Sequence, residues 1–200
     1  FTPTVEVDLC GHATLAAAFV IFNMMNYNGK EILFHSKNSG ILKVTQETDI
    51  LSLDFPSDQI TKCEMITEVI TGLGTKPEAL FRGKSDFMAV LKYEEAVLDL
   101  KPKFEELAKL KSRGIIVTAP GLGVDFVSRF FGPQSGINED PVTGSAHTTL
   151  IPYWSERLGK NVLTAKQVSE RGGVLYCENK GSRVIIGGKA ILYLVGEIYC

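Results

Sequence analysis

The sequence has no long hydrophobic run and no block of like charges. Its longest apolar segment, Leu15 to Phe22, is far too short to cross a bilayer. Twenty-one Lys and Arg residues stand against 23 Asp and Glu residues, and the net charge is −2. Because phosphate backbones are bound by clustered basic side chains, the composition argues against a nucleic-acid surface. We therefore expect neither a nucleic acid nor a membrane as a partner.

Cysteine is also scarce. Cys10, Cys63, Cys177 and Cys200 are widely spaced and form no CxxC pair, and the three histidines are scattered. This spacing argues against a structural zinc site, and we expect no metal. It fits a reducing cytoplasm better than a disulfide framework. We interpret the four cysteines as isolated, buried and inert. The alternative for Cys10 is a base whose thiolate is stabilised by a helix dipole.

The first part of the chain alternates strand and helix patterns. Residues 1–9 alternate apolar and polar side chains, as a half-buried strand does. Because this strand starts at the first residue, which is not Met, we expect the chain to be part of a longer protein. Residues 14–22 are apolar nearly all round, which predicts a helix that is buried on every side. Antiparallel strands are predicted next, at 31–35, 41–45 and 50–55.

The second part repeats this order. Helical spacing is found at 65–73, where Gly72 and Gly74 end the helix, and at 102–111, where Pro102 opens it. A second apolar helix begins near Gly144. Strands are predicted at 79–81, 87–91, 114–119, 125–131, 173–178, 183–186 and 190–195.

Two helices that are apolar all round each require a sheet around them. We therefore predict an α+β fold of two similar lobes, each a mostly antiparallel, barrel-like sheet around a central helix. The predicted division is 1–57 for the first lobe, 58–187 for the second, and 188–200 for a C-terminal strand that returns to the first lobe.

The segment 138–147 is the densest in chemical groups. It brings two carboxylates, two hydroxyls, a glycine and a histidine to one loop-to-helix junction. Helix N-termini bind anions because their first N–H groups are unpaired and carry partial positive charge. The alternative interpretation is an elaborate N-cap, in which Asp140 or Thr143 caps the helix and Pro141 stiffens the turn.

Two further segments carry candidate groups. His12 lies in the first turn of the first apolar helix, where the dipole disfavours a cation, so we expect a neutral imidazole that can donate or accept a hydrogen bond. The alternative is a structural histidine bonded to a nearby carbonyl. In the segment Gln167 to Gly173, Arg171 beside two glycines could hold a carboxylate. The alternative is a solvated arginine ahead of a glycine turn.

Together these segments resemble the phenazine-biosynthesis-like (PhzF-like) family. The resemblance rests on Cys10-Gly-His-Ala-Thr-Leu-Ala, Asp125-Phe-Val-Ser-Arg-Phe-Phe, Glu139-Asp-Pro-Val-Thr-Gly-Ser-Ala-His, Tyr153-Trp and Arg171-Gly-Gly. It runs from the first residue to the last in the family's order. It implies the diaminopimelate-epimerase type of fold with a site between two lobes. It also implies a homodimer and the use of no metal or organic cofactor.

The resemblance also implies roles for single residues. His12, Asp140 and Ser145 match active-site positions, and Gly144 with the amides around it matches the substrate-binding helix mouth. The predicted catalytic residues are therefore His12, Asp140 and Ser145. The predicted substrate-binding residues are Gly11, Ala13, Thr143, Gly144, Arg171 and Gly172.

We expect an isomerase or epimerase, without a cofactor, that moves a proton on a small carboxylate-bearing metabolite in the cleft. The phenazine enzyme isomerises a dihydro-hydroxyanthranilate, and most relatives have unknown substrates. The family's proton-shuttling glutamate lies ahead of Phe1 and is not in this sequence. One alternative is therefore a non-catalytic binding protein that retains the cleft. Another is a racemase with cysteine bases, for which Cys10 supplies one thiol while Thr143-Gly144-Ser145 supplies none.

Overall fold

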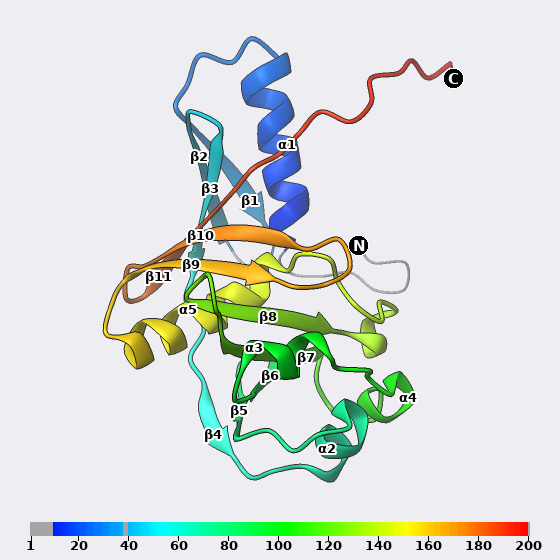
Figure 1. The fold of residues 1–200 in the computed structure, drawn as a ribbon. Coiled ribbons are helices and arrows are strands. Elements are labelled where there is room, and N and C mark those ends of the chain that lie inside the picture. The colour runs from blue at the N-terminus through cyan, green and yellow to red at the C-terminus, as the bar shows by residue number, and fades with distance from the viewer. Residues whose placement is uncertain (1–9, 38–39, 200) are drawn as a thin grey trace.

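One mixed sheet forms the frame of the protein. The computed structural model describes residues 10–37 and 40–199, and within these residues it contains an eleven-stranded sheet in the order β1-β2-β3-β11-β10-β9-β8-β7-β6-β5-β4 (Figure 1). The strands are β1 (Glu31–Ser36), β2 (Gly40–Glu47), β3 (Ile50–Pro56), β4 (Thr61–Cys63), β5 (Ala79–Arg82), β6 (Asp86–Val90), β7 (Gly114–Pro120), β8 (Phe126–Phe131), β9 (Val162–Gln167), β10 (Gly173–Asn179) and β11 (Arg183–Gly188). The helices are α1 (Gly11–Met24), α2 (Thr67–Leu73), α3 (Glu94–Leu98), α4 (Phe104–Leu107), the 3-10 helix η1 (Pro133–Ser135) and α5 (Gly144–Leu158).

The α+β class is confirmed, and the predicted strands from 31 to 186 are present. The sheet is mostly antiparallel, but β6 pairs with β7 and β8 pairs with β9 in parallel. Strands β4 and β9 have no counterpart in the sequence-based prediction, because β4 has only three residues and the alternation of β9 is short and follows directly on a helix. The predicted helix at 102–111 is reduced to the single turn of α4, since the chain turns away after Leu107.

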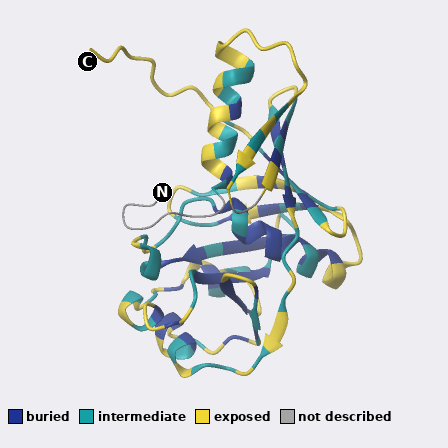
Figure 2. Ribbon diagram, turned by 180° about the vertical axis from the view of Figure 1, so that it is seen from behind, coloured by how far each residue is buried: buried dark blue, intermediate teal, exposed yellow. Residues whose placement is uncertain are grey.

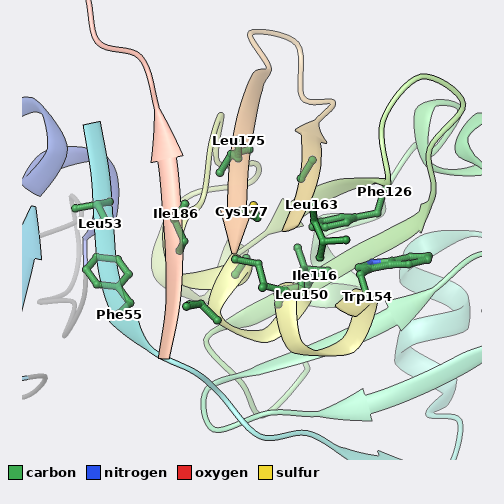
Figure 3. Close-up of a cluster of buried hydrophobic side chains, with 14 of the residues drawn as sticks. Leu53, Phe55, Ile116, Phe126, Leu150, Trp154, Leu163, Leu175, Cys177 and Ile186 are labelled. Carbon is green, nitrogen blue, oxygen red and sulfur yellow. The ribbon is translucent and has the colours of Figure 1, made fainter. Parts of the chain in front are cut away.

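Helix α5 is enclosed, as predicted. Nine of its 15 residues are buried, and Leu150, Ile151 and Trp154 lie in the main hydrophobic core with residues of β3, β8, β9, β10 and β11. Figure 3 shows Trp154 beside Phe126, and their rings stack with centroids 5.6 Å apart. The Trp154 indole N–H donates to the hydroxyl of Thr118 at 3.0 Å, so the one polar group of this ring is satisfied inside the core.

Helix α1 is not enclosed, and the prediction of a helix buried on every side is wrong for it. Only Gly11 and Ala18 are buried, and Val20 and Met24 are 41% and 44% exposed (Figure 2). The reason is that α1 packs mainly against β2, β3 and the start of α5, and much of its remaining surface is exposed. An apolar composition predicts that a helix is buried, but it does not predict which segment of the protein packs against it.

The predicted strand at 190–195 is also wrong. Strand β11 ends at Gly188, and residues 189–199 have no secondary structure (Figure 1). Ile191 and Tyr193 are 89% and 99% exposed, because this segment pairs with none of the strands that the structure describes. The strand predicted at 1–9 lies outside the described residues.

The division at 57/58 falls just after β3. The sheet continues across it, since Phe55 of β3 faces Val184 of β11, so the two lobes stay a prediction. Among residues 10–37 and 40–199, none of the helices has the length and apolar character needed to cross a membrane.

Candidate active site

The two helix N-termini that the sequence singles out meet in the structure. Helix α1 begins at Gly11 and α5 at Gly144, and a Cβ atom on Gly11 would lie 3.2 Å from the Cα atom of Gly144. This distance is tighter than most Cβ contacts, so the close approach of the two backbones favours glycine at both positions. Neither N-cap residue, Cys10 or Thr143, makes a side-chain capping bond. Thr143 thus occupies the N-cap position of α5, but its side chain does not cap the helix, and both helix N-termini keep N–H groups that can bind an anion.

A cavity of about 610 Å³ opens beside this meeting point. Five of the predicted site residues line it, namely Gly11, His12, Gly144, Arg171 and Gly172. Much of the remaining lining is apolar and comes from α1, β3, β10 and β11. Ala13, Asp140, Thr143 and Ser145 are not among the lining residues. The cavity thus has a polar end at the helix mouths and an apolar body.

Asp140 is held from several sides. Its backbone N–H donates to the carbonyl of Phe130 at 3.1 Å, and its own carbonyl accepts a hydrogen bond from the Gln167 side chain at 2.7 Å. Its Oδ2 atom accepts the hydroxyl proton of Thr143 at 2.5 Å. The charge of this carboxylate raises the pKa of His12, which places the two groups within electrostatic range of each other.

His12 is paired with Cys10. The Sγ atom of Cys10 lies 3.7 Å from Nε2 of His12, and this hydrogen bond lowers the pKa of Cys10 and raises the pKa of His12. Burial and the charge of Arg171 act against the rise at His12, but they do not cancel it. This rise runs against the direction that the helix dipole predicts, and the neutral state of His12 stays a prediction. The description of Cys10 as buried and inert is corrected, since it is half-buried and hydrogen-bonded.

The other cysteines differ among themselves. Cys177 is buried, and burial raises its pKa to about 12, in line with an inert thiol. Cys63 is half-buried, with its pKa raised by burial, and Cys200 lies outside the described residues.

Ser145 has a partner that the sequence did not indicate. Arg113 donates from Nη1 to the Ser145 hydroxyl at 2.9 Å and from Nε to Oδ1 of Asp86 at 3.0 Å, and its Nη2 atom also binds Oδ2 of Asp86. Burial acts to lower the pKa of Arg113, but its hydrogen bonds and ion pair with the buried Asp86 raise it overall. Because the serine oxygen accepts from a cation, its proton is available to a bound substrate. No motif surrounds Arg113 or Asp86, so only the folded chain reveals this pairing.

Arg171 is exposed on the turn between β9 and β10. That turn is tied to the loop of Asp140, because the Ser169 hydroxyl donates to the carbonyl of Pro141 at 2.7 Å and accepts from the N–H of Gly172 at 3.0 Å. Gly172 has φ +63°, a conformation that favours glycine. Arg171 also borders a second cavity of about 420 Å³ with Glu139 and Pro141. The guanidinium of Arg171 thus lies at the rim of the cavity. It takes part in no ion pair between described residues, so it is available to bind an anionic ligand.

His147, the last residue of the dense segment, is fully buried behind the helix mouth. Its Nδ1 atom lies 2.8 Å from the carbonyl of Thr143, which can only accept, so Nδ1 carries the proton. Its Nε2 atom has no hydrogen-bond partner among the described residues. Burial lowers the pKa of His147 to about 4, so the ring is neutral near pH 7.

We predict that His147 makes the fold sensitive to acid. In the unfolded chain this ring binds a proton below about pH 6.5, whereas in the folded chain it binds one only below about pH 4. The free energy of unfolding therefore falls as the pH is lowered through that window. The loss amounts to about 3 kcal/mol. In His147→Asn the amide can still donate to Thr143, but nothing titrates, and most of this loss should disappear. Urea unfolding at pH 7.5, 5.5 and 4.5 measures it, with the exposed His35→Asn as control. Equal pH dependence in the parent and His147→Asn would contradict the prediction.

In the described ranges, no three His, Cys, Asp or Glu side chains are grouped so that they could hold a metal ion.

Solved structures of other proteins share this fold. The fold is shared with the solved structure of a predicted epimerase, PA4716 of Pseudomonas aeruginosa, at TM-score 0.63 and 16% identity over 92% of this chain and 72% of that one, a likeness of fold alone. A PhzF-family protein of Enterococcus faecalis matches far better, at TM-score 0.94 and 49% identity over 100% of this chain and 76% of that one.

Sequence comparison agrees with the structural likeness. The profile of the family described as "Phenazine biosynthesis-like protein" matches residues 1–196. The chain therefore belongs to the phenazine biosynthesis-like (PhzC-PhzF) family. It is 50% identical over 198 residues to "Uncharacterized isomerase PA3578" of Pseudomonas aeruginosa, which covers 99% of this chain and 76% of that protein. It is 39% identical over 218 residues to a phenazine biosynthesis-like domain-containing protein of Bos taurus, over 99% of this chain and 75% of that protein.

Proposed function

We propose that this chain carries the active-site cleft of an isomerase that moves a proton on a small carboxylate-bearing metabolite without a cofactor. The observation that carries the proposal is the meeting of two helix N-termini at Gly11 and Gly144, with His12 on the cavity and Asp140 in electrostatic range. Unpaired amides at both mouths favour a bound carboxylate and the negative charge that develops when a carbon loses its proton. The names of bacterial relatives, which call them isomerases, support the same class.

The proposed roles draw on the family resemblance and are compatible with the contacts. An isomerisation of this kind breaks one C–H bond and forms another, so the composition of the substrate is unchanged. His12 and Asp140 position and polarise the reacting atoms, and Ser145, whose oxygen accepts from Arg113, donates its proton to the substrate. The resemblance assigns the proton transfer itself to a glutamate ahead of Phe1. Arg171 at the rim draws the carboxylate toward the mouths. A homodimer and a cytoplasmic location stay predictions.

The test is solvent exchange. The intact protein, with any segment that precedes Phe1 in its source, is incubated in deuterated water with a panel of small carboxylates, including amino acids, hydroxy acids and dihydro-hydroxyanthranilate. Mass spectrometry and proton NMR then detect deuterium in the recovered compound. We expect one deuteron per turnover at the isomerised carbon. Compounds that bind in calorimetry but never exchange would refute the proposal and favour a non-catalytic binding protein.

The Cys10–His12 pair gives specific support to a second candidate, a racemase that uses a thiolate base. The hydrogen bond to His12 lowers the pKa of Cys10, which increases the thiolate fraction. The opposite mouth offers Thr143, Gly144 and Ser145 and no thiol, so a single thiolate would have to act alone. Alkylation with iodoacetamide in a Cys63→Ser/Cys200→Ser background discriminates, because the remaining Cys177 is buried and should not react. Unchanged turnover after complete modification of Cys10 would exclude the thiol route.

A further inference from the structure

We propose that Gln167, the last residue of β9, is a positioning residue that sets the direction of the hydrogen bonds at the Asp140 carboxylate. The proposal rests on the proposed function, since it matters for catalysis only if Asp140 acts on a substrate. Gln167 is fully buried, at 0% exposure, and its amide makes three hydrogen bonds, all to the loop of Asp140 and Thr143.

Backbone partners define which end of this amide is oxygen. The N–H of Thr143 can only donate, so the atom 2.7 Å from it must be Oε1 of Gln167. The carbonyl of Asp140 can only accept, so the atom 2.7 Å from it must be Nε2. Exchanging the oxygen and nitrogen of this amide would place a donor against the Thr143 N–H and an acceptor against the Asp140 carbonyl. The opposite assignment of the amide is therefore excluded.

The orientation of Gln167 determines the orientation of the next group. The second proton on Nε2 is directed at the hydroxyl oxygen of Thr143, 3.2 Å away. Because that oxygen receives a proton from Gln167, its own proton points to Oδ2 of Asp140, 2.5 Å away. The chain of donors therefore runs in one direction, from Gln167 through Thr143 to Asp140. It engages Oδ2 and favours Oδ1 for contact with a substrate or with His12.

The frame that holds this relay is rigid. Gln167 faces Ser128 in the parallel pair of β8 and β9, and β8 also supplies the Phe130 carbonyl that accepts the Asp140 N–H. Two neighbouring strands thus hold the backbone of Asp140. Strand β8 does so through its Phe130 carbonyl, and β9 does so through the buried side chain of Gln167. A buried amide is costly unless all its groups are paired, and here each of its hydrogen atoms and its oxygen has a partner.

Gln167→Met tests the proposal, because methionine has a similar length and no amide. The matched control is Gln134→Met, since Gln134 also donates to two backbone carbonyls, those of Leu107 and Leu110, but lies away from Asp140. Proton NMR follows the Thr143 hydroxyl, which is identified as the resonance missing in Thr143→Val. Crystal structures of the same variants give the conformation of the Asp140 side chain. Neither measurement needs a substrate, so both remain decisive even if no carboxylate exchanges.

We expect the Thr143 hydroxyl to exchange with water about tenfold faster in Gln167→Met and the Asp140 carboxylate to rotate, with neither change in Gln134→Met. On any carboxylate that exchanges in the screen, kcat should fall about a hundredfold while KM stays near the parent value. An unchanged hydroxyl exchange rate together with an unchanged Asp140 conformation would overturn the proposal. If Gln167→Met does not fold, Gln167→Glu replaces it, because the carboxylate keeps the bond from the Thr143 N–H and loses the donors, and the same outcomes decide.

Discussion

His12→Ala and Asp140→Ala are each expected to lower deuterium incorporation by about a thousandfold or more. His12 lines the cavity at the mouth of α1, and Asp140 contributes the charge that favours its protonated form. Each variant removes a group that polarises the reacting atoms, and neither removes core packing, since His12 is exposed and Asp140 is half-buried. Melting temperatures should therefore change by only a few degrees. Exchange rates and thermal unfolding are measured side by side on the same preparations.

Two exposed residues serve as controls for these variants. His35 lies on β1 and Asp99 follows α3, and both are outside the cavity lining. His35→Ala and Asp99→Ala should exchange at the parent rate. If His12→Ala and Asp140→Ala also exchange at that rate, the assignment of the site is wrong.

Arg129→Met is expected to lower the free energy of unfolding by about 2–3 kcal/mol, because it leaves a half-buried carboxylate and two backbone carbonyls without their partner. Arg129 donates from Nε and Nη2 to the two oxygens of Glu139 at 2.7 and 2.9 Å. Its Nη1 atom donates to the carbonyls of Val97 and Leu100 at 3.1 and 3.0 Å, at the end of α3. The two charged side chains are only 12% and 22% exposed, so water compensates poorly for the loss.

Urea unfolding measures this loss, and Arg157→Met is the matched control. Arg157 is exposed and bonds to the hydroxyl of Tyr153 on its own helix, so its loss should cost less than about 1 kcal/mol. The double variant Arg129→Met/Glu139→Gln should recover part of the free energy of unfolding, because the Glu139 carboxylate that lost its partner is replaced by a neutral amide. Equal losses in Arg129→Met and Arg157→Met would contradict the prediction. The pairing gives Glu139, next to Asp140 in the sequence, a structural contact with β8.

Local patterns in the sequence were sufficient for much of the fold. Period-two alternation identified β1 to β3 and the strands from β5 to β8, and the glycines at the two helix starts indicated where α1 and α5 begin. These signals are local, since they depend on side chains two to four residues apart. Strand β9 was missed because its short alternation could not be separated from the end of α5, and the strand at 190–195 was predicted wrongly because alternation does not supply a partner.

The sequence alone was enough to predict the family and the main candidate site residues, because the residues of each motif are close together in the chain. These candidates are His12, Asp140, Gly144 and Ser145. The partners of those residues were decided only by the tertiary structure. Gln167 bonds to a loop 24 to 27 residues away, and Arg113 reaches Ser145 across 32 residues and Asp86 across 27. The exposure of α1 was likewise decided by neighbours in space. Hydrogen bonds and burial depend on where the whole chain brings its parts together, and no spacing of residues along the sequence encodes that directly.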